Sequence, residues 1–344
     1  MKYRPELHSL RGIACLLVII THAFSHVYPG FSIGHGVLVA GTGKIGVWLF
    51  FALSAFLITH NFLATGLHQS ALITYVAKRS TRILIPFFAA VVIYRIVGTL
   101  GIDSWRTAAE ILTFQSTAGH LWTIPTEFTF YFALPVILFV SLRVRERCGG
   151  SAELALYGAV AGLCLYLWEP ARGPINSMWF GWYITTFLAG MVAAILSFEQ
   201  RALSQWAAKL LGAGAALAIV LFTVAAKLDF FGNPTYYLVD KHYVYGPLWA
   251  VVIYSVYVAP PRFLRNTWLE AMGRWSYSAY LFHWAFCVWG AEYLDGPVAF
   301  MSILVASVAV GWVGYWTLEV PSGLVCKALL RERTVVRPAA VASS

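Results

Sequence analysis

The sequence predicts an all-α protein, a polytopic membrane helix bundle with about ten transmembrane helices and both termini in the cytoplasm. The first observation is composition: 60% of the 344 residues are hydrophobic and 11% are charged, whereas an ordinary soluble domain has about 25% charged residues. A soluble fold with so few charges could not cover its surface. The same composition excludes a disordered chain, a collagen and a disulfide-stapled secreted module.

The second observation is a series of ten apolar segments, each long enough to cross a bilayer, which takes about 20 mostly apolar residues. They leave no room for a soluble catalytic domain, so any chemistry must occur inside the bundle or in short loops. We expect one transmembrane domain, 1–325, and a short basic cytoplasmic tail, 326–344. The predicted segments lie near residues 9–28, 45–64, 83–100, 122–142, 153–169, 177–198, 207–226, 244–259, 276–293 and 298–319.

The third observation is the distribution of Lys and Arg. With the N-terminus placed in the cytoplasm, 18 of the 24 basic residues fall on the inner side and five on the outer side. This asymmetry follows the positive-inside rule and supports ten spans. It accounts for much of the net charge of +9, so we expect no nucleic-acid partner.

The first apolar segment carries two polar residues on one helical face. Arg11 precedes His22 by eleven residues, which is about three turns and roughly 16 Å along the axis. Arg11, at the cytoplasmic rim, could hold an anion while His22 acts as a general base deeper in the membrane. The alternative is a topogenic arginine with a hydrogen-bonded core histidine. His26 completes an HxxxH pattern, but no third ligand accompanies it, so we predict no metal site.

A basic group stands before the third segment, in YVAKRSTRILIP. Arg79 and Arg82 are three residues apart and would share a face of a helix, with Lys78 adding a third charge. Guanidinium groups suit bidentate phosphate recognition, so the pair predicts a site for a phosphorylated cytosolic ligand. The alternative is a loop charge that sets topology. We interpret Pro86 as the start of the third helix.

The stretch HLWTIPTEFTFYFALP brings four side chains into or beside the fourth segment: His120, Trp122, Glu127 and Tyr131. A carboxylate inside the membrane needs a partner. Glu127 could form a cluster with Tyr131, one turn away, and could orient a histidinium at His22 as a triad acid does. The alternative is a structural polar network between helices. His120, near the outer end, could contact an acceptor.

The ninth segment carries a polar stripe. Ser276, Tyr280 and His283 recur at i, i+4 and i+7, so they face protein or a cavity rather than lipid. They either line a substrate channel or link helices. Three further polar residues follow the seventh segment, where they would suit a sugar or simply face water: Asp229, Asp240 and His242.

Six motifs follow one another from residue 4 to residue 321. Arg11 to His22 has the form Arg-x10-His, and Glu319-Val-Pro321 has the form E-x-P. Between them lie KIGVWLFFALSAFLI, KRSTRILIP, HLWTIPTEFTFY and YSAYLFHW. Together these resemble the acyltransferase-3 family of integral membrane acyltransferases. The chain departs from the family pattern at Ala55, which replaces a glycine, and at Phe128, which replaces the second carboxylate of the usual pair.

The resemblance implies a ten-helix bundle in the bacterial cytoplasmic (inner) membrane. It also implies transfer of an acyl group from cytosolic acyl-CoA to a hydroxyl of an extracytoplasmic glycan. His22 would be the general base or acyl-transfer histidine, supported by Glu127, and Arg11, Arg79 and Arg82 would contact the CoA. The same resemblance and the polar pattern give these candidate acceptor or channel residues: His120, Trp122, Tyr131, Tyr280 and His283.

We therefore expect a stand-alone membrane module that acts as a membrane-bound O-acyltransferase with no bound cofactor and no metal. The expected donor substrate is acetyl-CoA or succinyl-CoA, and the other partners are the polysaccharide acceptor and the lipid bilayer. Two alternatives remain. One is a proton-coupled small-anion transporter with the intramembrane His and Glu as a relay. The other is an acyltransferase for a lipid-linked sugar or a secreted small molecule.

Overall fold

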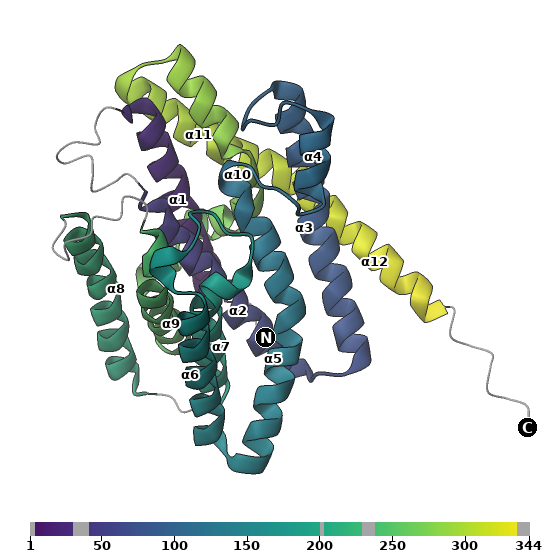
Figure 1. The fold of residues 1–344 in the computed structure, drawn as a ribbon, viewed down its shortest axis with the longest axis vertical. Coiled ribbons are helices and arrows are strands. Elements are labelled where there is room, and N and C mark those ends of the chain that lie inside the picture. Colours follow the sequence, from purple (N-terminus) through teal and green to yellow (C-terminus); the bar gives the residue numbers. More distant parts are fainter. Residues whose placement is uncertain (1–3, 30–40, 200–202, 229–237, 336–344) are drawn as a thin grey trace, which may run out of the picture.

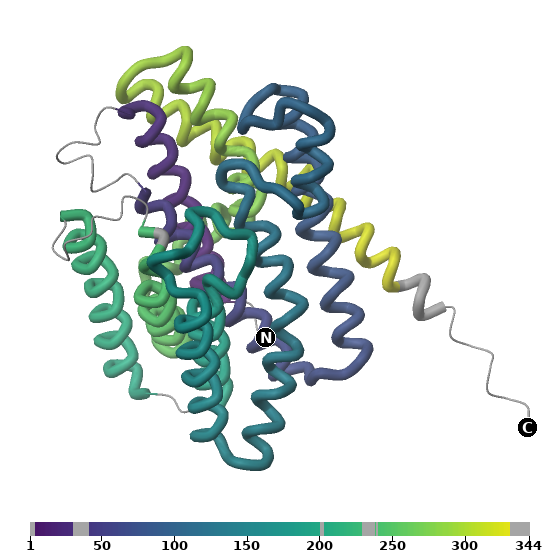
Figure 2. The backbone as a smooth tube through the Cα atoms, in the orientation of Figure 1, coloured from purple at the N-terminus to yellow at the C-terminus, as the bar shows by residue number. Residues whose placement is uncertain are grey.

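The structure, a computed structural model, describes residues 4–29, 41–199, 203–228 and 238–335, and every regular element in these ranges is helical (Figures 1 and 2). The predicted all-α bundle is confirmed. Each predicted apolar segment coincides with one helix: α1 (Pro5–Val27), α2 (Gly43–Thr65), α3 (Gln69–Val97), α5 (Thr123–Cys148), α6 (Gly150–Leu167), α7 (Ile184–Phe198), α8 (Gln205–Lys227), α9 (His242–Val258), α10 (Thr267–Tyr293) and α11 (Gly296–Gly314).

Within the described ranges, eight of these helical stretches are long and apolar enough to cross a membrane. They contain α1, α2, α3, α5, α6, α7, α8 and α11. The other two are α9, which has only 17 residues, and α10, whose polar stripe lowers its hydropathy. Both lie within the bundle, where α9 packs against α7 and α8, and α10 packs against α1 and α11.

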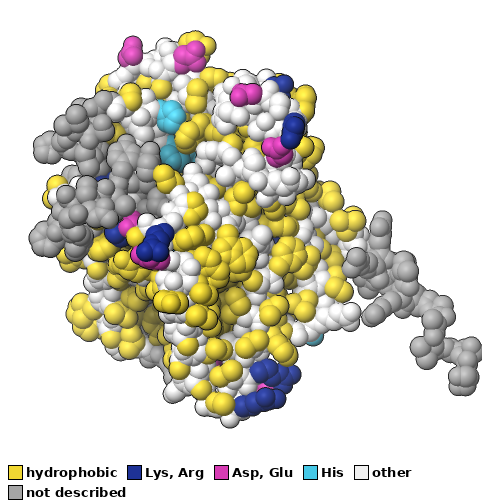
Figure 3. All heavy atoms as spheres, viewed as in Figure 1, with side chains coloured by type: hydrophobic (Ala, Val, Ile, Leu, Met, Phe, Trp, Pro, Cys, Tyr) yellow, Lys and Arg dark blue, Asp and Glu magenta, His cyan; other side chains and the backbone are white. Residues whose placement is uncertain are grey.

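The ends of the helices pair as the predicted topology requires. Arg145, near the end of α5, contacts both Glu153 of α6 and Glu199 after α7. Glu6 of α1 accepts a hydrogen bond of 2.9 Å from Arg265, in the turn between α9 and α10. These segments were all predicted to lie on the inner side. Figure 3 shows hydrophobic side chains over most of one face and a cluster of Lys and Arg at its lower end.

Two glycines allow α1 and α10 to approach closely. A Cβ atom added at Gly273 would lie 1.9 Å from the carbonyl oxygen of His8, and one added at Gly12 would lie 2.5 Å from that of Leu269. Small residues at such crossings let backbones touch, which is a common way to join membrane helices. The crossing fixes α10 against α1 and so sets the position of His283 relative to His22.

The interpretation of Pro86 as a helix start is wrong, because α3 is continuous from Gln69 to Val97 with Pro86 inside it. A proline inside a helix frees carbonyls of the preceding turn, and a membrane helix tolerates it when neighbours satisfy them. The Tyr277 hydroxyl of α10 donates to the carbonyl of Ile83 at 2.8 Å. Arg79 and Arg82 therefore lie on a helix rather than in a loop.

Two helices were not predicted. The short α4 (Trp105–Leu112) follows α3, and a π-helical turn (Tyr315–Glu319) joins α11 to α12 (Val320–Val335). Helix α12 packs against α3 and then leads away from the bundle (Figure 1). The predicted tail boundary at 326 thus falls inside a helix, and residues 336–344 lie outside the described ranges.

Candidate active site

A cavity of about 520 Å³ opens at the end of the bundle predicted to be extracytoplasmic. We call it the outer cavity. It lies among α1, α2, α10 and the 3-10 turn η3 (Gly119–Trp122), which begins the stretch leading into α5. Among the described residues that line it, none is Asp or Glu. Its polar and aromatic lining consists of Thr21, His22, Ser25, His26, Lys44, His120, Trp122, Asn176, Tyr280 and Trp284.

The outer cavity contains a chain of two histidines whose protons can be assigned from their partners. His283 Nδ1 lies 2.7 Å from the carbonyl oxygen of Tyr280, and because a carbonyl only accepts, this nitrogen carries the proton. In the neutral ring His283 Nε2 is then an acceptor, and it lies 2.8 Å from His22 Nδ1, which donates to it. His22 Nε2 is left with a free lone pair. Such a nitrogen can act as a general base.

His120 and His26 are oriented in the same manner. His120 Nε2 donates to the carbonyl of Leu281 at 3.1 Å, and His26 Nδ1 donates to the carbonyl of His22 at 2.8 Å. The rings of His22, His26 and His120 all pack on Trp284, with centroids 4.8 to 5.6 Å from it. Residues from α1, η3 and α10, far apart in the sequence, therefore meet around one aromatic ring.

Below the outer cavity lies a small inner pocket of about 40 Å³ that contains Arg11 and Glu127. It shares Val47 and Tyr280 with the outer cavity. Glu127 Oε1 accepts a hydrogen bond of 3.1 Å from Ser54 Oγ. Arg11 lies near Glu127, within electrostatic range of it, and its Nε atom is buried without a hydrogen-bond partner. Arg11, which we predicted at the cytoplasmic rim, thus lines the same pocket as a carboxylate that can balance its charge.

A third cavity, the basic pocket, has a volume of about 540 Å³ and lies between the end of α2 and the first half of α3. It contains both arginines of the RxxR motif. The guanidinium of Arg79 lies 5.3 Å from the centre of the Tyr131 ring, and that of Arg82 lies 3.9 Å from Glu319. Its polar lining consists of Asn61, Thr65, His68, Ser70, Thr74, Tyr75, Lys78, Arg79 and Arg82, with no acidic residue among the described ones.

The three cavities follow one another through the bundle. Arg79 of the basic pocket contacts Tyr131, one helical turn from Glu127 of the inner pocket. Tyr280 lines both the inner pocket and the outer cavity. Its hydroxyl donates to the carbonyl of His120 at 2.7 Å. Contacts between side chains thus connect the basic pocket with the inner pocket and the outer cavity, and we call this series of side chains the polar path.

Within that path the partners differ from those we expected. The ring nitrogen of His22 is bonded to His283 rather than to Glu127. Glu127 is hydrogen-bonded to Ser54, which we did not expect, and also to Tyr131, as the spacing of one helical turn predicts. Trp122 packs on Trp48 and Phe51 and lies beneath Lys44. Sequence reasoning missed three residues because no local spacing connects them with the histidines: Lys44, Asn176 and Trp284.

The other polar residues singled out in the sequence lie elsewhere. His242 is buried at the start of α9, against the ring of Trp48 and 3.3 Å from the Thr185 hydroxyl, so it is not solvated as a loop residue would be. Asp240 pairs with Lys241 at 2.6 Å. Asp229 lies outside the described residues. Neither His242 nor Asp240 lines one of the three cavities.

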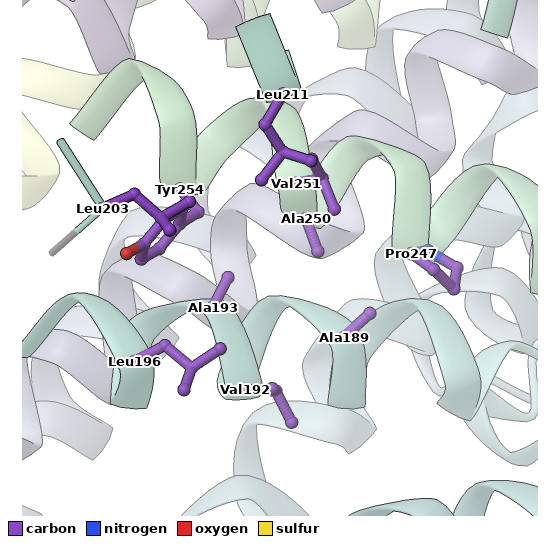
Figure 4. Close-up of a pocket in the computed structure, with 10 residues that line it drawn as sticks. All are labelled: Ala189, Val192, Ala193, Leu196, Leu203, Leu211, Pro247, Ala250, Val251 and Tyr254. Carbon is purple, nitrogen blue, oxygen red and sulfur yellow. The ribbon is translucent and has the colours of Figure 1, made fainter. Parts of the chain in front are cut away.

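An apolar crevice of about 440 Å³ lies between α7, α8 and α9 (Figure 4). Of the ten residues that line it, only Tyr254 has a polar side-chain atom, and Ala189, Ala193 and Ala250 leave the space open. It therefore lacks a cluster of ionisable or polar side chains that could catalyse a reaction, and the polar path is the candidate active site.

The family model described as an acyltransferase domain matches residues 4–316. The chain belongs to the acyltransferase-3 family. Because it also contains helices long and apolar enough to cross a membrane, we conclude that it is an integral membrane protein.

Three curated relatives illustrate the range of this acyltransferase-3 chain's similarities. It is 26% identical to nodulation protein 10 of Rhizobium leguminosarum bv. viciae, covering 98% of this chain and 93% of that protein. It is 22% identical to acyltransferase MdmB of Streptomyces mycarofaciens, and the match covers 98% of this chain and 94% of that protein. It is 24% identical to a putative O-acetyltransferase of Staphylococcus aureus strain MSSA476 over 87% of this chain, but it spans only 53% of that protein. No solved structure matches significantly. These names support an O-acyltransferase of the membrane.

Proposed function

We propose that the protein transfers an acyl group from acyl-CoA, bound at the basic pocket, to a hydroxyl of a glycan in the outer cavity. The observation that carries this proposal is the polar path that joins the two cavities through Tyr131, Glu127 and Tyr280. An enzyme with its donor and its acceptor on opposite sides of a bilayer needs such a route. In the predicted orientation, the path starts in the cytoplasm of a bacterial cell and ends outside its inner membrane.

The basic pocket suits the donor because CoA carries several phosphate charges. Lys78, Arg79 and Arg82 all line the pocket, and no acidic residue is among its described lining. The one described carboxylate paired with them is Glu319, 3.9 Å from Arg82. Arginine binds phosphate bidentately, so the pair forms a stronger site than lysines alone. The thin pantetheine arm of acyl-CoA is the part that would enter the path beside Tyr131, and the inner pocket, about 40 Å³ in this structure, would have to widen for the thioester to reach His22.

The outer cavity suits the chemical step. The acceptor hydroxyl attacks the thioester carbonyl carbon while His22 Nε2 takes its proton. The C–S bond then breaks, and the proton passes from His22 to the leaving CoA sulfur, which gives an ester and free CoA. His283 accepts from His22 Nδ1, and the Tyr280 carbonyl holds the His283 proton. This chain orients His22 and spreads the positive charge that it gains.

Two further observations bear on the identity of the acyl group and of the acceptor. The O-acetyltransferase name of the staphylococcal relatives favours an acetyl group over a succinyl group. The aromatic and polar lining of the outer cavity, including Trp284 and Asn176, is typical of sugar sites, where apolar ring faces and hydroxyl groups are both contacted. A lipid-linked sugar or a secreted small molecule would use the same groups.

The test uses purified protein in lipid nanodiscs with radiolabelled acetyl-CoA, and mass spectrometry of surface glycans from a deletion strain. Wild-type protein should release CoA and restore glycan esters, and His22→Ala should do neither. Arg143→Ala is the control, because Arg143 is an exposed residue that pairs with Glu146 outside the path. If the ester content of the surface glycans is unchanged in the deletion strain, a glycan is not the acceptor. Uptake of a small anion without CoA release would instead establish the transporter.

A further inference from the structure

We propose that the outer cavity selects an acidic sugar, and that Lys44 binds the carboxylate of that acceptor. The proposal rests on the proposed function, since it names the class of acceptor for the same site. Its basis is the position of one ammonium group, which no motif or spacing connects with the site.

Lys44 lies in the wall of the outer cavity with neutral partners. Its Nζ atom donates to the carbonyl of Ile175 at 3.0 Å and to Oδ1 of Asn176 at 2.7 Å, and it lies 3.9 Å above the ring of Trp122. No carboxylate of the described residues pairs with it. An ammonium has three N–H donors, so one remains for a ligand. A half-buried ammonium without a counter-ion is costly, and an anionic ligand offsets that cost.

The rest of the cavity agrees in charge. Its basic side chains are Lys44, His22, His26 and His120, and no Asp or Glu is among the described lining residues. With His22 as a neutral base, Lys44 is the group that gives the cavity its positive charge, which attracts ligands of the opposite sign and repels those of the same sign. The cavity therefore disfavours a cationic acceptor and favours an anionic one over a neutral one.

Helix packing places Lys44 near the level of His22. Thr21, one residue before His22, forms a hydrogen bond of 3.0 Å with Thr42, two residues before Lys44. Gly43 packs on the same Thr21, and Lys44 lies within electrostatic range of the His22 ring. The ammonium and the basic nitrogen thus serve one ligand rather than two separate sites.

A hexuronate fits this pair of groups. Its carboxylate and its ring hydroxyls lie on one small rigid ring, so the carboxylate can bind Lys44 while a hydroxyl faces His22. Asn176 holds the ammonium in place and itself donates to the carbonyl of Gly119 at 3.5 Å, which connects Lys44 to the turn that carries His120. The aromatic rings of Trp122 and Trp284 supply the apolar walls that sugar rings contact.

The test compares methyl β-D-glucuronide with methyl β-D-glucoside, which differ only at the carboxylate. Tryptophan fluorescence of the protein in nanodiscs reports binding, because Trp122 and Trp284 line the cavity. Wild-type protein should bind the glucuronide about tenfold more tightly than the glucoside, as a charge-assisted hydrogen bond predicts. Lys44→Met should abolish that preference, and Lys44→Arg should retain most of it.

Three results would overturn the proposal: equal affinity of wild-type protein for the two sugars, a preference that survives in Lys44→Met, or no binding of the glucuronide. A His22→Ala variant separates this outcome from failure of the proposed function. It should keep the preference for the glucuronide while losing CoA release. Wild-type protein that binds the glucuronide selectively but never consumes acetyl-CoA would refute the acyltransferase and leave the anion site standing.

Discussion

At the residue scale, the central feature is a histidine pair in which a backbone carbonyl takes the place of the usual acid. The Tyr280 carbonyl fixes the His283 proton, His283 fixes that of His22, and His22 Nε2 is left as the base. His283 acts through His22, so it is a positioning residue. Glu127, expected in this role, lies in the inner pocket with Arg11 and Ser54 instead.

Replacing His283 tests that assignment. His283→Ala removes the acceptor of the His22 Nδ1 proton, so we expect CoA release to fall about 100-fold or more, within the range for losing oriented acid–base catalysis. His283→Gln presents an amide oxygen to His22 and should recover part of that loss. Rates of CoA release across pH for both variants provide the measurement. Equal rates for Ala and Gln would mean that His283 only fills space.

The two arginines of the basic pocket give a second prediction. Arg79→Ala and Arg82→Ala should each weaken binding of CoA about tenfold or more, because each removes a charge-assisted contact with phosphate. Equilibrium binding of CoA to protein in nanodiscs measures this. Arg143→Ala removes a charge of the same sign at the exposed end of α5 and should leave binding unchanged. If all three variants bind alike, the donor site lies elsewhere.

At the scale of elements, the helices are held by close backbone contact and by side-chain hydroxyl groups that donate to backbone carbonyls of neighbouring helices. Tyr277 donates to the carbonyl of Ile83 in α3 at 2.8 Å, and Tyr75 compensates Pro135 in α5 by donating at 2.9 Å to the carbonyl of Tyr131. That carbonyl is the one four residues before the proline, so it has no helical partner. Both donors come from helices that bound the polar path, and they keep its walls regular.

A double-mutant cycle tests the compensation in α5. Tyr75→Phe should destabilise the protein by about 1 kcal/mol, since it leaves a carbonyl without a donor. In a Pro135→Ala background the restored N–H satisfies the Tyr131 carbonyl, and the same substitution should cost less. Thermal unfolding in detergent gives the two differences. Equal costs in both backgrounds would show that the Tyr75 hydroxyl does not compensate Pro135.

The crossing of α1 and α10 gives a further prediction. Gly273→Ala would place a methyl group against the backbone of His8, so we expect a loss of about 1–3 kcal/mol of stability from overpacking. It should also lower activity, because the contact between His22 and His283 depends on that crossing. Gly158→Ala in α6 is the matched control, as nothing lies within 4 Å of the added atom. A Gly273→Ala variant as stable as the Gly158→Ala variant would contradict the close packing.

At the scale of the whole molecule, the proposed roles of the cavities depend on the membrane orientation that the distribution of Lys and Arg predicts. Under the proposed function, the basic pocket would open to the cytoplasm, where the proposed donor is found, and the outer cavity would face the opposite side. The ion pairs at the ends of α5, α6 and α7 join segments predicted to lie together on the inner side. The orientation itself can be measured with a cysteine that the chain already has.

Cys148 is exposed at the end of α5, whereas Cys15, Cys287 and Cys326 are buried. A maleimide that cannot cross membranes should label the protein in inverted vesicles and spare it in intact cells. Cys148→Ser should remove the labelling and serve as its control. Labelling of Cys148 in intact cells would show that the orientation is opposite to the predicted one. The assignment of the donor and acceptor sides would then be wrong.

The sequence by itself determined the fold class, the ten helices that coincide with its apolar segments, and the histidines, arginines and glutamate of the candidate site. The low content of charged residues predicts a membrane protein. The length and the hydrophobic pattern of each apolar segment then predict a helix, so local patterns are sufficient to find the helices. Single ionisable residues in apolar helices, such as His22 and Glu127, are recognisable as candidates because placing them in a membrane costs free energy. Tertiary structure alone decided which of them pair. His22 and His283 are 261 residues apart, and Lys44 reaches the site only because α1 and α2 pack side by side. No local spacing records such contacts, since they depend on how whole helices cross.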